Sequence, residues 1–259
     1  MHLLYKILNK LFSINRVLIT KQALSWDHAL KNSHNYNQDK LVNNIFLSTQ
    51  NVLKKKYKYE SDGINFNNLN IDHNFLESLK KCIKTDNTIL LDFGGSLGTT
   101  FFKYHDLISK NKLIEWFIIE QEKIFEKSKI LNFPINLKFF KNIDEIQVKP
   151  DIILLGSVLQ YIEHHNKLLT KLISLKPNYV FIERTIFSIN NLEPIYIQEN
   201  YFNFKKTSYP VRAISLKLLI KFMLKANYIV VNKYENKDII AGDNVKVNSI
   251  LFKKKSNEK

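Results

Sequence analysis

A short glycine-rich segment has the residue types and spacing of a ligand-binding turn. It reads Asp92-Phe93-Gly94-Gly95-Ser96-Leu97-Gly98 and overlaps the end of the apolar run 88–93, which predicts a buried strand. Its glycines let the chain turn tightly and bring backbone N–H groups close to a ligand. The next apolar run ends at Glu120, where doubly wound folds place a carboxylate that accepts hydrogen bonds from ribose hydroxyls. The pattern therefore predicts a site for a nucleoside-bearing cofactor.

The positions of the glycines narrow the choice of cofactor. A dinucleotide fingerprint needs G-x-G-x-x-G, whereas Gly94 and Gly98 are four positions apart. A phosphate-binding loop ends in Gly-Lys-Ser/Thr, but Thr99 follows the last glycine here. What remains resembles the first motif of class I methyltransferases that use S-adenosylmethionine, usually acid-x-Gly-x-Gly-x-Gly, with Ser96 in place of the middle glycine. The alternative is an ordinary strand-to-helix turn, with Glu120 as a solvated strand end.

The elements that would position this turn alternate between strands and helices from Thr88 onward. This predicts parallel β–α–β units with right-handed crossovers. The fold class expected is α/β: a Rossmann-like, mostly parallel seven-stranded sheet flanked by helices. Helices are expected over 39–54, after an N-cap at Asp72, over 99–108, and from an N-cap at Ser215 through Leu224. Strands are expected near 88–93, 114–119, 136–140, 151–156, 178–183, 228–234 and 247–253, with an irregular segment over 184–213.

Length and composition indicate one globular domain with an extension. The chain has 259 residues, and 45% of them are hydrophobic, which is enough for a globular core. We expect an N-terminal helical extension over 1–84 and the cofactor-binding domain over 85–255. The single cysteine, Cys82, excludes a disulfide framework and suits a reducing cytoplasm. The formal net charge is +15, but the lysines are scattered, so the charge alone does not indicate a nucleic-acid partner.

The N-terminal segment 1–20 is apolar but contains Lys6, Lys10 and Arg16, so we do not expect it to span a bilayer. No small-residue cleavage site follows it, which argues against a signal peptide. Its leucines have helical spacing, and two interpretations stay open. One is an amphipathic helix on an anionic membrane face, and the other is a helix packed on the domain. We therefore expect a cytoplasmic protein, with peripheral contact at the inner face of the membrane as the open alternative.

Seven further segments specify the resemblance more closely. They are Ser25-Trp26-x-x-Ala29, Tyr36, Tyr59–Asp62, Leu155–Tyr161, Ile182–Thr185, Ile197-Gln198 and Ser208–Pro210. Together they resemble a family of class I S-adenosylmethionine-dependent methyltransferases associated with bacterial surface-polysaccharide (O-antigen-type) gene clusters. The resemblance covers roughly residues 22–235 and implies the fold and the cofactor, but says less about the acceptor. The family often has Arg where Ser61 stands and Asp where Glu183 stands.

The resemblance also implies where the cofactor lies, since ligands of open α/β sheets bind beyond the carboxyl ends of the strands. The glycine loop is expected to wrap the methionine end and the ribose, and the carboxylate after the second strand to bind the ribose hydroxyls. Asp144, after the third strand, is expected at the adenine, with an N-cap role as its alternative. The residues expected to bind the cofactor are Asp92, Gly94, Gly95, Ser96, Gly98, Glu120, Asp144 and Ser157.

Methyl transfer from a sulfonium mainly needs an aligned acceptor and the exclusion of water, because the donor is already activated. An alcohol acceptor also needs a base with a pKa near 7, which suits histidine. The catalytic candidates are His164, with an exposed helix-start residue as the alternative, and Tyr161, with a core aromatic as the alternative. Aromatic faces and bidentate donors suit sugars, and arginine suits phosphate. The acceptor is therefore expected to contact Gln160, Arg184, Gln198 and Tyr209.

Other functions are less consistent with the residues. Amino-methylating DNA enzymes carry an (Asp/Asn/Ser)-Pro-Pro-aromatic box after the fourth strand, where this chain has Gly156–Leu159, and pyrimidine C5 enzymes need a cysteine beyond the first motif. A nucleic-acid methyltransferase and a non-catalytic binding protein of the same fold are the alternatives, and a dehydrogenase is the weakest. No metal site is expected, because Glu163, His164 and His165 are adjacent and point apart. The expected partner is a small-molecule or glycan acceptor, including lipid-linked glycans, and not nucleic acid.

Overall fold

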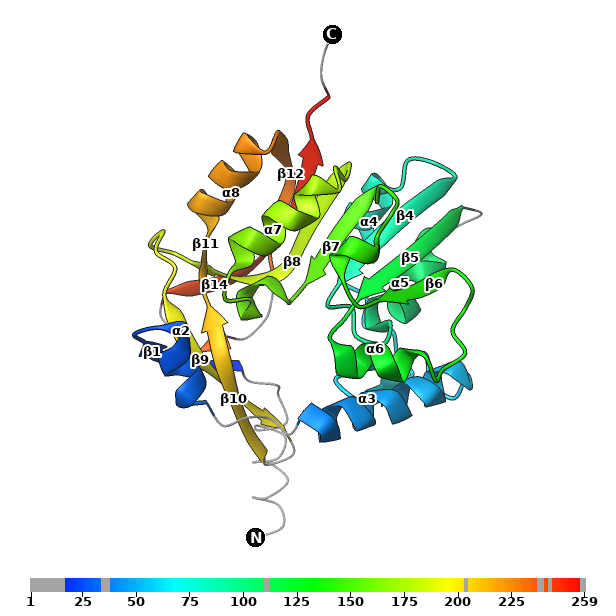
Figure 1. The fold of residues 1–259 in the computed structure, drawn as a ribbon, viewed down its shortest axis with the longest axis horizontal. Coiled ribbons are helices and arrows are strands. Elements are labelled where there is room, and N and C mark those ends of the chain that lie inside the picture. The colour runs from blue at the N-terminus through cyan, green and yellow to red at the C-terminus, as the bar shows by residue number, and fades with distance from the viewer. Residues whose placement is uncertain are drawn as a thin grey trace.

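The fold is built on one large, mostly parallel sheet, shown in Figure 1. The computed structural model describes residues 17–33, 38–109, 112–202, 205–236, 240–241 and 244–256. The strand order is β12-β14-β8-β7-β4-β5-β6, and the short β11 (Ile214–Ser215) also pairs with β8. The strands are β4 (Asn87–Phe93), β5 (Leu113–Ile119), β6 (Leu137–Phe140), β7 (Ile152–Gly156), β8 (Tyr179–Ser188), β12 (Tyr228–Glu235) and β14 (Val245–Lys254). This confirms the predicted Rossmann-like fold class.

The path of the chain through this sheet determines where a ligand can bind. The chain enters at β4, moves outward through β5 and β6, and then crosses to β7 on the other side of β4. β4, β5, β6, β7 and β8 are parallel, whereas β14 is antiparallel to both of its neighbours. The strand order therefore reverses between β4 and β7, which is the usual position of the ligand crevice in open α/β sheets.

Helices cover both faces of the sheet, and each face has its own hydrophobic core. On one face, α4 (His73–Cys82) and α5 (Thr99–Ser109) pack on Trp116 and Phe181, which are fully buried. On the other face, α7 (His165–Ser174) and α8 (Leu216–Lys225) pack on Phe187 and its neighbours. Burial from both sides explains why the parallel strands are continuous apolar runs rather than alternating patterns.

Two helix starts that the sequence predicted are confirmed by their capping hydrogen bonds. The Asp72 carboxylate accepts a hydrogen bond from the Phe75 N–H at 3.0 Å and caps α4. The Ser215 hydroxyl accepts a hydrogen bond from the Leu218 N–H at 3.3 Å and caps α8. Each side chain satisfies one of the N–H groups that a helix start leaves without an intrahelical partner.

The expectation of an irregular segment over 184–213 was wrong. β8 continues to Ser188, and the hairpin of β9 (Ile195–Phe202) and β10 (Lys205–Arg212) follows it. The hairpin belongs to a second sheet with the order β10-β9-β1-β13, completed by β1 (Val17–Ala23) and β13 (Ile240–Ala241). The pairing of β1 with β9 joins residues far apart in the sequence, which local patterns do not show. Pro210 lies in the edge strand β10, where a missing backbone N–H is tolerated.

The region before residue 85 contains strands as well as helices, so the description of a helical extension was incomplete. Residues 17–20 belong to β1 and not to a helix, while residues 1–16 lie outside the described residues. After β1 come α2 (Trp26–Lys31), α3 (Gln38–Leu53), and the hairpin of β2 (Tyr59–Ser61) and β3 (Ile64–Phe66). α3 packs against α6 (Glu122–Ser128) through a separate small core. The boundary near residue 84 stays a prediction.

No helix in the described part of the chain is long and apolar enough to cross a membrane.

The central core makes a stability prediction. Phe181 is fully buried and its ring stacks on that of Phe75 with centroids 5.2 Å apart, whereas Ile135 is 94% exposed. Phe181→Ala should lower the free energy of unfolding by about 3–5 kcal/mol, because it leaves a cavity in a packed core. Ile135→Ala should change it by less than about 0.5 kcal/mol. Urea unfolding monitored by circular dichroism measures both values, and similar losses in the two variants would contradict this packing.

Candidate functional site

The glycine loop between β4 and α5 adopts a conformation that requires its glycines. Gly94 and Gly98 have φ values of +78° and +99°, and Ser96 between them has +55°. An added Cβ at Gly95 would lie 2.6 Å from Oδ2 of Asp92, so a side chain cannot fit there. At Gly94 a Cβ would lie 2.8 Å from Cγ2 of Val158, in addition to the strain of a positive φ. The loop therefore passes too close to Asp92 and Val158 to accommodate side chains at Gly95 and Gly94 without a shift of these neighbours.

Glu120, which the sequence predicts as the ribose-binding residue, lies directly against this loop. Its Oε1 accepts a hydrogen bond from the Ser96 N–H at 2.9 Å, and its Oε2 accepts one from the Gln121 N–H at 2.8 Å. The pKa of Glu120 is raised, because burial has a larger effect than the two hydrogen bonds, which oppose the rise. The ends of β4 and β5 thus bring a carboxylate and a glycine loop into contact, as the sequence pattern predicted.

Asp92, the acid of the motif, lies beneath the loop and not at the surface. It is only 2% exposed, and its Oδ2 accepts a hydrogen bond from Nε1–H of Trp116 at 3.2 Å. Its pKa is raised to about 7, mainly by burial. The hydrogen bond from Trp116 opposes this rise, and the nearby Glu120 charge adds to it. Asp92 therefore packs under Gly95 and is not on the outer surface of the loop.

The segment after β7 also adopts a turn beside this loop. Ser157 has a φ of +53°, and its N–H donates to the Glu183 carbonyl oxygen at 2.9 Å. Gln160 is 3% exposed, and its Nε2 donates to the Ser157 carbonyl oxygen at 3.2 Å. Its Oε1 is buried without a hydrogen-bond partner in the described part of the chain. A buried acceptor of this kind is costly unless a ligand supplies the donor.

Three of the predicted site residues form one hydrogen-bonded chain. The Tyr161 hydroxyl donates to Oε1 of Gln198 at 3.2 Å, and Nε2 of Gln198 donates to the Tyr209 hydroxyl at 2.9 Å. The two tyrosine rings meet edge to face with centroids 5.3 Å apart. Gln198 is 1% exposed, and burial raises the pKa of Tyr161. The segment after β7 and the β9–β10 hairpin therefore come together, although the sequence placed the second of them in a loop.

Arg184 lies at an irregularity in β8. Its φ is +46°, its N–H donates to Oγ of Ser249 at 3.0 Å, and the pairing of β14 with β8 shifts register between Asn248 and Ile250. The bulge interrupts the alternation of side chains between the two faces of β8, and the Arg184 side chain is exposed. Burial raises the pKa of Asp62, on the β2–β3 hairpin, and the nearby Arg184 charge opposes that rise.

The sequence analysis did not assign a role to Glu60, which is fully buried beside the glycine loop. Its Oε1 accepts a hydrogen bond from the Thr99 hydroxyl at 2.7 Å, and its Oε2 accepts one from the Gly63 N–H at 3.0 Å. Burial raises its pKa to about 7, although the two hydrogen bonds oppose this rise. Thr99 is the first residue of α5, so Glu60 ties the β2–β3 hairpin to the helix that follows the glycine loop. The segment Tyr59–Asp62, part of the resemblance, was the signal that could have indicated it.

Asp144 and His164, like Arg184, lie on the surface. Asp144 is in the short 3₁₀ helix 143–145, where its Oδ2 accepts a hydrogen bond from Nζ of Lys171 at 2.6 Å. His164 is the exposed N-cap residue of α7 and makes no side-chain capping bond. Its neighbour His165 is buried, with Nε2 3.6 Å from Oε1 of Glu193. The roles of Asp144 at an adenine and of His164 as a base stay predictions. Among the described residues, no three His, Cys, Asp or Glu side chains are grouped so that they could hold a metal ion.

Comparison with known proteins supports the fold. No protein-family model and no curated protein sequence matches this chain. Among solved structures, the N-terminal domain of EvdMO1 with SAH bound matches 81% of this chain and 96% of its own, at 11% identity and a TM-score of 0.50. The CcbJ methyltransferase from Streptomyces caelestis (10% identity, 70% and 88% covered) has a TM-score of 0.46. An S-adenosylmethionine-dependent methyltransferase from Clostridium acetobutylicum matches 83% of this chain and 99% of its own, at 12% identity and a TM-score of 0.48. The match to the EvdMO1 domain supports the Rossmann-like fold that the strand order of the sheet shows.

The buried carboxylates predict how stability depends on pH. The pKa values of Asp92 and Glu60 are about 7 in the folded protein, above those of exposed carboxyls. Between pH 4 and 7 the folded state then binds more protons than the unfolded state, so these groups make stability fall as the pH rises. Asp92→Asn should reduce the fall in the free energy of unfolding between pH 4 and 7 by roughly 1–3 kcal/mol. The asparagine side chain still offers an oxygen acceptor to Trp116.

Urea unfolding between pH 4.5 and 8 measures this dependence as the difference between the variant and the wild type. The exposed Asp86 provides the control, and Asp86→Asn should leave the wild-type curve unchanged. An Asp92→Asn curve parallel to that of the wild type would contradict the buried, protonated state of Asp92.

Proposed function

We propose that this chain is an S-adenosylmethionine-dependent methyltransferase that acts on a small-molecule or glycan acceptor. The contact between the glycine loop and Glu120 carries the proposal: a carboxylate oxygen accepts the Ser96 N–H at 2.9 Å at the carboxyl ends of β4 and β5, next to the switch point of the sheet. The positive φ values of Gly94, Ser96 and Gly98 give this loop the tight turn that such a cofactor site needs. The methyltransferase fold supports the same conclusion.

The residues around the loop suit the parts of this cofactor. The backbone of Gly94–Gly98 would hold its methionine end and ribose, and Glu120 would bind the ribose hydroxyls. Asp92 would support the loop from below, and Ser157 would lie under the sulfonium. Asp144 would approach the adenine, which requires it to leave or share its bond with Lys171. The bound cofactor would supply an activated methyl group, so the protein needs no further electrophile.

The chain's own residues would then align the acceptor and remove its proton. The amides and hydroxyls of the Tyr161–Gln198–Tyr209 chain are neutral donors and acceptors, which suit the hydroxyl groups of a sugar. The unpartnered Oε1 of Gln160 would accept a hydrogen bond from the acceptor. Arg184 would pair with a phosphate of the acceptor. Proton removal would fall to His164, which is exposed at the start of α7.

The acceptor class follows from the sequence resemblance. It favours a residue of a surface polysaccharide, on a free or lipid-linked precursor at the cytoplasmic face of the membrane. Mass spectrometry of surface glycans from a deletion strain would identify it, since a residue lighter by one methyl group should appear. Unchanged glycans would contradict the polysaccharide assignment and leave the methyltransferase proposal to be tested by cofactor binding.

Cofactor binding tests the contact between Glu120 and the loop. Glu120→Ala should weaken S-adenosylmethionine binding by roughly 1–3 kcal/mol, because the ribose hydroxyls lose a charged acceptor. Glu122 provides a matched control, since it lies two residues away on α6 and pairs with Lys141 on the surface. Isothermal titration calorimetry should show wild-type affinity for Glu122→Ala. Equal affinity in Glu120→Ala, or a preference for NAD, would refute the proposed cofactor site.

Turnover on the identified acceptor tests the acceptor pocket. Arg184→Ala and Gln198→Ala should each lower kcat/KM by about tenfold or more, because each removes a polar contact to the acceptor. Both should keep the wild-type affinity for S-adenosylmethionine, since the cofactor contacts lie at 94–98 and at Glu120. Thermal unfolding checks that Gln198→Ala, a change at a buried side chain, still folds. Wild-type turnover in both variants, or a loss of cofactor affinity in either, would show that the pocket lies elsewhere.

A further inference from the structure

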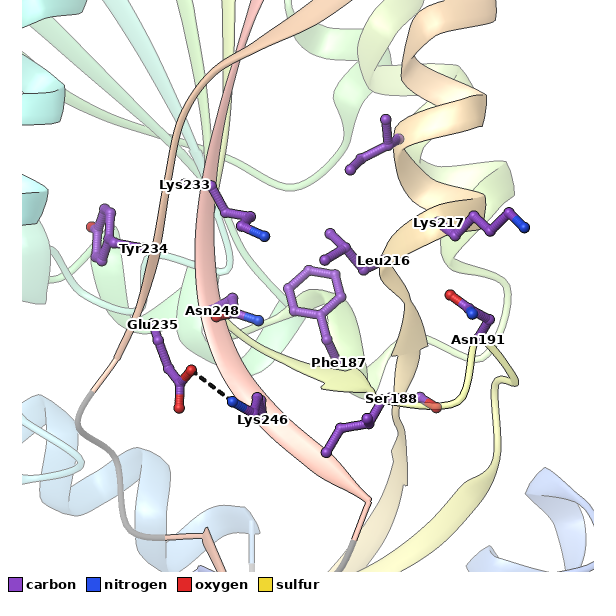
Figure 2. A pocket seen from close by; sticks show the side chains of 12 residues that line it. Phe187, Ser188, Asn191, Leu216, Lys217, Lys233, Tyr234, Glu235, Lys246 and Asn248 are labelled. Carbon is purple, nitrogen blue, oxygen red and sulfur yellow. Dashed lines mark hydrogen bonds and ion pairs between the residues drawn. The ribbon is translucent and has the colours of Figure 1, made fainter.

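A hollow lies on the back of the strands that form the acceptor side of the molecule. Figure 2 shows its lining side chains between α8 and the ends of β8, β14 and β12. Its volume is about 650 Å³. Alternate residues of these strands face opposite ways: Ile186 and Val247 pack toward the second sheet, whereas Phe187 and Lys246 line the hollow. The hollow is therefore separate from the Tyr161–Gln198–Tyr209 chain.

The lining of the hollow combines apolar surface with positive charge. Apolar side chains include Phe187, Leu216 and Ile220, and three lysines, Lys217, Lys233 and Lys246, lie around them. Among the lining residues the carboxylate is Glu235, which forms an ion pair with Lys246 at 3.0 Å. The remaining two lysines leave the hollow with a net positive charge, so its chemistry fits an anionic group attached to an apolar body.

The outer face of α8 continues the same combination. Its exposed residues span an arc of about 120° on the helix at 3.6 residues per turn. They are Lys217, Leu218, Lys221, Leu224 and Lys225. The two leucines are 50% and 46% exposed, and α8 contains no carboxylate. Ile189, at the rim of the hollow, is 57% exposed. The inner face is anchored in the core by Leu219 and Met223, which are buried.

We propose that the outer face of α8 binds an anionic lipid bilayer and that the hollow accepts a phospholipid headgroup phosphate. Lysines that alternate with exposed leucines and have no acidic partner on the helix fit a surface with both negative charge and apolar depth. Nucleic acid offers phosphates but no apolar layer for the leucines, so it fits this face less well. The proposal concerns residues outside the candidate methyl-transfer site and does not depend on it.

Vesicle sedimentation with the full-length protein tests the proposal. The wild type should bind vesicles of phosphatidylcholine mixed with phosphatidylglycerol at physiological salt, and should bind phosphatidylcholine alone much more weakly. Lys217→Ala/Lys221→Ala should lower the partition coefficient roughly thirtyfold, because each lysine contributes near an anionic surface. Leu218→Ser/Leu224→Ser should lower it about tenfold or more through the loss of apolar contact. Lys233→Ala, inside the hollow, should lower it about fivefold.

Matched variants on a distant surface provide the controls. Lys54→Ala/Lys56→Ala removes two exposed lysines that follow α3, and Leu47→Ser/Ile135→Ser removes two exposed apolar side chains. Both should bind as the wild type does, and circular dichroism should show that all variants fold. Absence of wild-type binding to the mixed vesicles would overturn the proposal. Wild-type binding by the α8 variants would overturn it as well, since another part of the chain would then make the contact.

Discussion

The site depends on the close approach of one backbone loop to two carboxylates at the ends of β4 and β5. Asp92 leaves no room for a Cβ at Gly95, and Glu120 accepts the N–H of Ser96 from the other side. Both side chains are largely removed from water, so each would be costly without the hydrogen bonds it receives. The strands must therefore end in register for the loop to form, and their parallel pairing from Asn87↔Leu113 to Phe93↔Ile119 ensures this.

A third buried carboxylate extends the same constraint to the N-terminal region. Glu60 joins Gly63 in the β2–β3 hairpin to Thr99 at the start of α5, and the Ser48 hydroxyl on α3 donates to the Gly63 carbonyl oxygen at 2.7 Å. A helix, a hairpin and the residue after the glycine loop thus share one hydrogen-bonded cluster. The predicted boundary near residue 84 crosses this cluster, so the extension contributes to the surroundings of the site.

Features set by neighbouring residues could be predicted from the sequence, and features set by distant pairing could not. The buried runs that form β4 and β5, and the caps at Asp72 and Ser215, depend on residues within a few positions of one another. The β9–β10 hairpin pairs with β1, which lies about 180 residues earlier in the sequence (Ile19↔Gln198), and it carries polar residues of the candidate pocket. Arg184 was selected by residue type, but the bulge that turns it out of β8 depends on Ser249 in β14.

The extension of β8 beyond Arg184 connects the two proposed surfaces. Ile186 on this extension packs on the second sheet, which carries Gln198 and Tyr209, while Phe187 lines the hollow beside α8. Phe187 follows Arg184 by three positions in β8, which corresponds to a distance of about 10 Å along the strand. A bilayer bound at α8 would therefore lie behind the wall of the acceptor pocket, on the opposite face of β8. The same strand that forms the pocket wall would then set its distance from the membrane.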